Sequence, residues 1–431
     1  MRCFDTHHTR FWILRLRLYF TQKGYNTAHS QKPLMKPYLF LTVMLLLTCL
    51  VSQPGSPAAA ADPAAHPQSG VVLCLPGIYP LDPQDCLPLG PSEVRTRNAQ
   101  QGILLPLAPL PATPPDRTLV SVPFSYAMLK ENELTPVYSS MEDAQARENP
   151  IDTIDPGRLR FIAYLDSFDT DDNGKPNYFH LSSNGWVSVD SVATRISAVP
   201  WFQGLTFQRT PLNSFGWIIP LNPTAQTKRT PGKEIGDYTG HLLTEYDQVQ
   251  IYATQKVGDE EWFLVGPDEW LEASLVGRVV PNARPPEGVT NGRWIEVNLF
   301  EQTLAVYDNN QLVFATLIAT GLGPFWTRPG LFQIFSRLES TLMRGAFETD
   351  QSDFYYLQEV PWTMYYDNAR ALHGAYWRTR FGFPQSHGCI NLAPGDAHWL
   401  YNWAKEGDWV YVWDPSGETP TDPASYTVGA P

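Results

Sequence analysis

The stretch "FPQSHGCINLAPG", residues 383–395, decides how the last third of this chain folds and is interpreted. It places the last cysteine of the chain, Cys389, directly after a Ser-His-Gly, and Asn391 follows two residues later. A second His-Gly pair, His373 and Gly374, lies shortly before it. A cysteine is a useful nucleophile near neutral pH when a base or a positive field helps to form the thiolate, and histidine is a common partner. The stretch therefore predicts a reactive thiol.

Two histidines are candidates for the base that serves Cys389: His387, two residues earlier, and His373. Side chains two apart in a strand point the same way but need not meet, whereas a residue from a neighbouring strand approaches the thiol more directly. We therefore expect His373 to be the general base and His387 to shape the site. Glycine lets the backbone pass close to a substrate, so we expect N–H groups around Gly388 and Cys389 to stabilise an oxyanion.

Other side chains near the thiol leave two alternatives open. Ser386 and Asn391 are expected to orient the loop through hydrogen bonds. Metal binding is an alternative, although the spacing matches no zinc template and one candidate ligand falls in a predicted helix. A purely structural cluster is the other alternative. The candidate metal ligands are His373, His387, Cys389 and His398.

The segments around this stretch predict mainly β structure. Alternating apolar and polar residues predict strands at 294–299, 303–307 and 311–319, separated by Asn and Asp turns. The segment "GDAHWLYNWAKEG" predicts a helix that Asp396 caps and Gly407 ends, before a last strand "DWVYVWD".

With these elements, "HGAYWRTRFGFPQSHGCINL" (373–392) resembles the signature of the L,D-transpeptidase catalytic domain family, of the YkuD type. "TRPGLFQI" and the closing helix and strand are similar to that family too, so the resemblance covers about residues 290–414. The resemblance implies a β-sandwich with a short helix, and it implies that no cofactor is required.

The resemblance also implies a reaction on peptidoglycan peptide stems in cell-wall biogenesis. Cys389 would attack the carbonyl that joins the third residue to a terminal D-alanine, and an amine of a neighbouring stem would resolve the thioester. His373 would take the thiol proton and return it to the leaving amine. Gly374, the next residue, would belong to the same motif. The positions that build the pocket and the oxyanion site would be Ser386, His387, Gly388 and Asn391. The alternatives are a cysteine L,D-carboxypeptidase or peptidase that uses water, and a catalytically silent wall-binding protein.

Residues 1–61 predict a leader with a secretory signal. From Met35 the chain has a lysine, an apolar run over 38–51 and small residues over 58–61. The run is shorter than the roughly 20 residues that span a membrane, with a retained anchor as the alternative. Residues 1–34 are basic, unlike the rest, so we expect translation to begin at Met35. The expected location is extracytoplasmic, in the cell envelope or cell wall.

The five cysteines divide by position. Cys3 and Cys49 fall in the leader, and Cys74 and Cys86 flank a loop inside a Pro-rich linker, residues 62–116. Oxidising compartments favour disulfides, so we expect Cys74 and Cys86 to be bonded. The remaining thiol, that of Cys389, is unpaired, which is uncommon in an exported protein unless its reactivity is used.

An internal repeat lies between the linker and the site. Residues 177–192 align without gaps on residues 261–276. Each copy follows a β-rich segment, so we expect two small β-barrels, 117–195 and 196–285. They resemble bacterial Src-homology-3-like modules, which suggests contact with the cell wall.

Three smaller features have two interpretations each. The repeat aligns Trp186 with Trp270, which we expect to be core aromatics, with ligand-binding platforms as the alternative. The segment "DTDDNGKPNYFH" begins like a calcium loop, but its twelfth residue is a histidine, which favours a hairpin turn around Asn173 and Gly174. Residues 415–431 are expected to be a tail.

Composition limits the classes of partner. The chain has 431 residues with a formal net charge of −13 and a pI near 5.1. This acidity repels phosphate backbones and offers no basic stripe, so we expect no nucleic-acid partner. The length predicts several domains, and 39 prolines predict linker segments among them.

Overall fold

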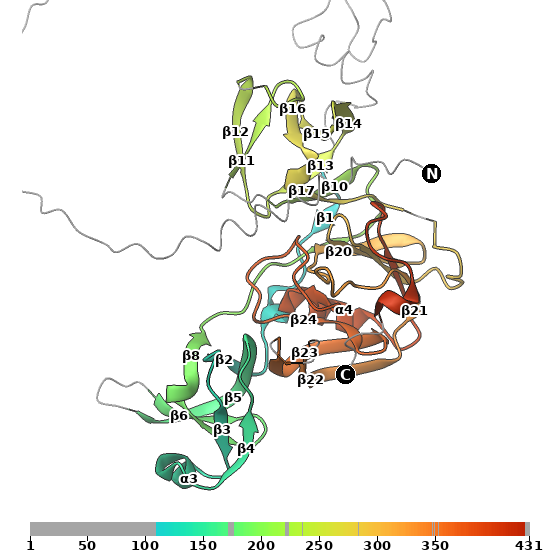
Figure 1. The fold of residues 1–431 in the computed structure, drawn as a ribbon. Coiled ribbons are helices and arrows are strands. Elements are labelled where there is room, and N and C mark those ends of the chain that lie inside the picture. The colour runs from blue at the N-terminus through green and yellow to red at the C-terminus, as the bar shows by residue number, and fades with distance from the viewer. Residues whose placement is uncertain are drawn as a thin grey trace, which may run out of the picture. The chain divides into compact units, whose positions relative to one another are not determined.

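The computed structural model describes residues 109–426, except for 171–175, 220–223, 235, 283, 347, 349 and 352. The predicted leader and the Cys74 to Cys86 loop lie outside these residues, as do Asn173 and Gly174. The described chain consists mainly of strands with a few short helices, which confirms the predicted fold class (Figure 1). No helix among the described residues is long and apolar enough to cross a membrane.

One seven-stranded sheet belongs to the domain that carries the site. Its strands β18, β19 and β20 coincide with the three predicted strands. Strands β18 and β26 pair in parallel, and the other neighbours are antiparallel. In order, the sheet holds β1 (Ala112–Thr113), β9 (Leu205–Phe207), β20 (Gln311–Leu317), β19 (Thr303–Asp308), β18 (Trp294–Asn298), β26 (Trp409–Trp413) and β21 (Gly330–Gln333).

A second group of strands carries the site itself. The hairpin β22 (Ser336–Gly345) and β23 (Tyr355–Asp367) is followed by β24 (Arg370–Gly374) and, in parallel to β24, by β25 (Ile390–Leu392). Apolar side chains of both groups and of helix α4 (Pro394–Trp403) form one buried core. Its members include Ile295, Val306, Met364, Leu372, Ile390 and Leu400.

Helix α4 differs from its prediction at both ends. It begins at Pro394, which suits the first turn because proline lacks the N–H that is unpaired there anyway. Asp396 therefore does not cap the helix. Its carboxylate instead accepts hydrogen bonds from Gly204 N at 2.6 Å and Thr316 Oγ1 at 2.6 Å. The helix ends at Trp403, before Gly407.

The strands that precede the site form two β modules with the same pairing pattern. In the first, β2 pairs with β5 and β8, and β3 pairs with β4 and β7. In the second, β10 pairs with β13 and β17, and β11 pairs with β12 and β16. The first module holds β2 (Ser125–Leu129), β3 (Thr135–Tyr138), β4 (Pro150–Ile154), β5 (Leu159–Thr170), β6 (Pro176–Leu181), β7 (Trp186–Ser188) and β8 (Val192–Ile196).

The sequence repeat coincides with repeated elements. The second module holds β10 (Ser214–Ile218), β11 (Thr224–Lys228), β12 (Tyr238–Thr244), β13 (Gln248–Ile251), β14 (Ala253–Val257), β15 (Glu260–Gly266), β16 (Glu269–Glu272) and β17 (Val276–Val279). A short 3-10 helix follows β7 at Val189–Ser191 and follows β16 at Ala273–Leu275. The resemblance of these modules to Src-homology-3-like domains stays a prediction.

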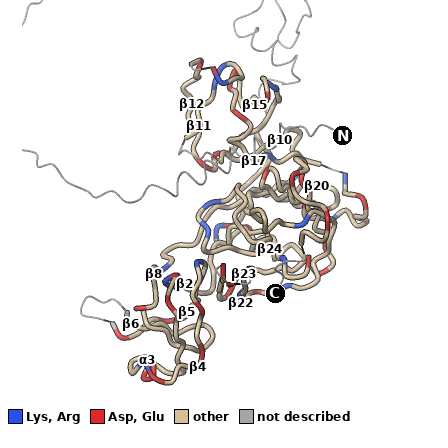
Figure 2. The backbone as a smooth tube through the Cα atoms, viewed as in Figure 1, with Lys and Arg blue, Asp and Glu red and all other residues tan. Residues whose placement is uncertain are grey.

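The repeated tryptophans have different surroundings. Trp270 is buried, at 6% exposure, as a core aromatic should be. Trp186 is only half-buried and lies face to face with His180, with ring centroids 4.7 Å apart. The two copies therefore share strand order but not the use of this position. Lys and Arg are interspersed with Asp and Glu along the described chain (Figure 2).

Candidate active site

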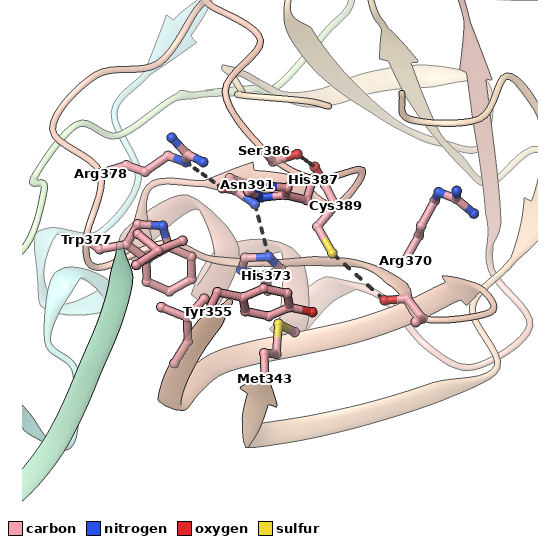
Figure 3. Close-up of a pocket in the computed structure, with 13 residues that line it drawn as sticks. Met343, Tyr355, Arg370, His373, Trp377, Arg378, Ser386, His387, Cys389 and Asn391 are labelled. Atoms are coloured by element: carbon pink, nitrogen blue, oxygen red, sulfur yellow. Dashed lines mark hydrogen bonds between the residues drawn. The ribbon is translucent and has the colours of Figure 1, made fainter. Parts of the chain in front are cut away.

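The candidate site lies where β24 and β25 run side by side. His373, near the end of β24, is in register with Asn391 of β25, and Cys389 directly precedes β25. A pocket opens at this point (Figure 3). It is lined by Leu159, Met343, Tyr355, Leu357, Ala369, Arg370, His373, Trp377, Arg378, Ser386, His387, Cys389 and Asn391.

The structure brings most of the predicted site residues to this one pocket. Its lining includes Cys389 together with His373, His387, Ser386 and Asn391. His398 is not among the lining residues; its ring stacks on Trp362 at 4.3 Å, and its Nδ1 lies 3.2 Å from a backbone carbonyl oxygen. The four candidate metal ligands are therefore not gathered in one place. Among the described residues, no group of three or more His, Cys, Asp or Glu could hold a metal ion.

His373 is held in one tautomer by its two neighbours. Its Nε2 lies 3.0 Å from Asn391 Nδ2, and its Nδ1 lies 3.2 Å from the Gly374 carbonyl oxygen. An amide nitrogen only donates, and a carbonyl only accepts. Nε2 therefore accepts from Asn391, and Nδ1 carries the hydrogen that it donates to Gly374.

His373 is neutral at physiological pH. The ring is 2% exposed, and burial lowers the pKa of His373 to about 4. The Arg378 cation lowers this pKa further, and the hydrogen bond to Gly374 opposes both effects. The imidazole is therefore unprotonated, and able to act as a base, at any pH well above 4.

Cys389 is a neutral thiol in the resting site. Burial raises the pKa of Cys389, and the backbone N–H of Ala371 and the Arg370 cation offset part of this increase. Its Sγ also lies 3.9 Å from the Ala369 carbonyl oxygen (Figure 3). The raised pKa of Cys389 and the lowered pKa of His373 both disfavour a preformed pair of thiolate and imidazolium. The thiol proton is therefore expected to move only when a substrate binds.

The loop before β25 is held by a side chain. Ser386 Oγ donates to the Cys389 carbonyl at 2.6 Å and accepts from the Gly388 N–H at 3.1 Å. Gly388 has φ of 115°, a conformation that glycine adopts without the penalty other residues incur. The predicted loop-orienting role of Ser386 matches this geometry. The Gly388 N–H, expected to face an oxyanion, is engaged within the loop.

Arg378 is a residue that the sequence reasoning missed. Its guanidinium donates to Asn391 Oδ1 at 2.6 Å, to the Gln385 carbonyl at 2.6 Å and to Gln385 Oε1 at 3.2 Å. With Oδ1 taken by Arg378, the amide of Asn391 must present Nδ2 to His373. Arg378 therefore fixes the orientation of Asn391 and, through it, the tautomer of His373.

Aromatic rings hold the second histidine of the pocket. The His387 ring lies 4.7 Å from Phe325 and 6.1 Å from Tyr355, which it faces at 16°. Burial lowers the pKa of His387. These contacts agree with a role in shaping the site. Tyr355 and Met343 come from the β22–β23 hairpin, far from the motif in sequence, and no local pattern could have identified them.

Known structures resemble this part of the chain at low identity. An L,D-transpeptidase from Stackebrandtia nassauensis is 26% identical over 31% of this chain and 60% of its own, with a TM-score of 0.25. An Enterococcus faecium L,D-transpeptidase mutant is 24% identical over 28% of this chain and 50% of its own, with a TM-score of 0.26. The chain thus spans about half, or slightly more, of the length of these proteins. No curated protein matches.

A family model identifies the domain that holds the pocket. Residues 292–412 match the model of the L,D-transpeptidase catalytic domain, YkuD. This range contains β24, β25 and the loop between them, and with them most of the pocket. Residues 292–412 of this chain therefore belong to the YkuD family of L,D-transpeptidase catalytic domains.

Proposed function

We propose that this protein is an exported L,D-transpeptidase that cross-links peptidoglycan peptide stems through an acyl-enzyme on Cys389. The observation that carries the proposal is one pocket, within a domain of this family, that is lined by a free thiol and a neutral imidazole. A thiol and a base in one site are what nucleophilic acyl transfer requires.

The first half of the reaction forms a thioester. The Cys389 proton passes to Nε2 of His373 while Sγ attacks the carbonyl carbon of the stem's third residue. Nε2 now accepts from Asn391, so the Asn391 amide yields this position as the proton arrives. The tetrahedral intermediate collapses, its bond to D-alanine breaks, and the imidazolium returns the proton to the leaving amine.

The second half of the reaction consumes the thioester. An amine from the side chain of a second stem attacks the thioester carbonyl and loses a proton to His373, while Sγ leaves and recovers a proton. The products are a stem-to-stem amide and the original thiol. Water in place of the amine would give hydrolysis from the same intermediate, so the acceptor decides between transpeptidase and carboxypeptidase activity.

The location of the protein is also a proposal. The signal predicted over residues 35–61 supports export to the cell envelope. An unpaired Cys389 suits that location only if its reactivity is used. The two β modules are proposed to contact the wall in which the stems lie.

Variants at the two central residues test the proposal. Cys389→Ala should abolish turnover of stems that end in D-alanine while leaving the fold intact, because the nucleophile is removed. His373→Ala should cost roughly 10²- to 10⁴-fold in kcat, as loss of a general base does. His398→Ala is the matched control, since this histidine lies outside the pocket lining, and it should have a mild effect. Turnover by Cys389→Ala within about tenfold of the wild type would contradict the proposal.

A further inference from the structure

One wall of the pocket comes from outside the catalytic domain. Strand β5 of the first β module pairs in parallel with β23, which places Leu159 opposite Tyr355 and Phe161 opposite Leu357. Leu159 lines the same pocket as Cys389. The family match covers residues 292–412, so Leu159 lies outside the matched domain.

The first module is held in place beside His373 by specific contacts. Tyr126 stacks on Tyr376 with ring centroids 3.5 Å apart, and its hydroxyl donates to the Glu359 carbonyl at 2.9 Å. Gln358 Oε1 accepts from the Ala163 N–H at 2.9 Å. These contacts join β2 and β5 of the module to β23 and to the segment that follows His373. The module therefore fixes β5 at the edge of the pocket.

Backbone close approach sets where β5 begins. A Cβ added to Gly157 would lie 2.2 Å from the Phe354 carbonyl oxygen, so no side chain fits there without movement of the chain. Gly157 lies two residues before Leu159, and Phe354 directly precedes Tyr355. Glycine at this position is thus what allows the two strands to meet at the pocket.

The pocket lining combines polar and apolar side chains. Cys389, His373 and Asn391 provide the polar groups, whereas Leu159, Met343 and Leu357 provide aliphatic surface. Leu159 is only half-buried, so its side chain is available to a ligand. An aliphatic wall beside a nucleophile favours an aliphatic group next to the bond that is attacked, and its position limits the size of that group.

We propose that Leu159 is a specificity-determining residue: it supplies aliphatic lining to the pocket and limits the aliphatic group that an acyl donor places next to the scissile carbonyl. The part of this inference that concerns the acyl donor rests on the proposed function. The first β module then has a role in substrate selection.

Thiol reagents of different size test this inference without relying on turnover. The full-length protein is alkylated at Cys389 with iodoacetamide and, separately, with N-cyclohexylmaleimide, and the ratio of the two rates is measured. Leu159→Trp should lower the ratio of the maleimide rate to the iodoacetamide rate by roughly tenfold, because the larger side chain narrows the pocket. Leu159→Ala should raise this ratio. Gly157→Ala should also change the ratio, because it displaces β5.

Leu165 supplies a matched control on the same strand. It is 51% exposed and is not among the pocket-lining residues. Leu165→Trp and Leu165→Ala should leave the ratio within about twofold of the wild type, as surface substitutions do. If Leu159→Trp does not fold, Leu159→Ala decides alone. Equal ratios for the wild type and the Leu159 variants would overturn the inference.

The donor experiment separates this inference from the proposed function. Leu159→Ala should accept stems whose third residue has a bulkier side chain, seen as a lower KM for them at similar kcat. A wild type that forms no acyl-enzyme with any stem would refute the proposed function. The alkylation ratio would still decide whether Leu159 walls the pocket.

Discussion

Asp396 should make the stability of this protein fall as the pH rises. Asp396 belongs to the first turn of α4, and its carboxyl group is fully buried, where it bonds to Gly204 and Thr316. Burial raises the pKa of Asp396 to about 7, and the two hydrogen bonds offset part of the increase. An unfolded chain gives the same group a pKa of about 3.9. The folded protein thus keeps a proton that the unfolded chain has released.

The size of the effect follows from the two pKa values. The pKa is higher in the folded state, so its contribution to stability is fully present below about pH 4 and is lost as the pH rises to about 7. The free energy of unfolding should fall by about 1.4 kcal/mol for each pH unit in this window. Over roughly three units this amounts to about 4 kcal/mol.

Asp396→Asn tests this reasoning. The amide keeps an acceptor for the Gly204 N–H and can donate to Thr316 Oγ1, but it does not titrate. We expect the variant to gain stability relative to the wild type between pH 4 and pH 7, measured from urea midpoints at each pH. Asp152→Asn, at an exposed position, is the control and should follow the wild type. A constant difference between Asp396→Asn and the wild type would refute the linkage, because it would mean that the folded protein holds Asp396 ionised.

Four further predictions concern the site. The rate of Cys389 acylation should fall only as the pH drops through about 4, where His373 becomes protonated. An acylation rate that already falls as the pH drops through about 6.5 would contradict this. Alkylation of the substrate-free thiol should rise only at a pH above the usual thiol range, since burial raises the pKa of Cys389; a plateau near neutrality would argue for a preformed thiolate. Arg378→Ala should lower kcat by roughly 10²-fold and move the acid limb upward, whereas Arg380→Ala, which removes an exposed cation, should do neither. Gly388→Ala should destabilise the protein by about 1–3 kcal/mol in urea unfolding, because an alanine at φ of 115° is strained.

The motif residues could be predicted because they are close in sequence. Ser386, Gly388 and Cys389 lie in one loop, so their spacing alone brings them together. His373 needed one further assumption, that it returns on a neighbouring strand, and β24 and β25 do pair in register. Local patterns are enough to predict the strands themselves, because the alternation of apolar residues decides which side chains share a sheet face.

The rest of the pocket depends on contacts between distant segments. Leu159 and Tyr355 are paired across nearly half the chain, and no local pattern indicates which strand will lie beside which. Arg378 lies within the quoted motif, yet only the fold shows that it reaches Asn391. The start of α4 was misassigned because Asp396, a good capping residue type, is used by Gly204 from another segment.

The two modules show a similar limit. The repeat predicted two small β modules, and the structure gives both copies the same pairing pattern. It could not predict that Trp270 is buried while Trp186 lies half-buried against His180. That difference depends on the neighbours of each tryptophan, which the alignment does not preserve.

The most direct test is the mass of the intact protein during reaction. Residues 62–431 are incubated with a disaccharide-tetrapeptide, and the masses of the protein and of the muropeptides are followed over time. We expect a thioester adduct on Cys389, release of D-alanine and a cross-linked dimer, with no adduct in Cys389→Ala. An adduct and D-alanine without a dimer would point to hydrolysis. A folded protein that forms no adduct would contradict the proposed function and favour a wall-binding protein with a silent catalytic domain.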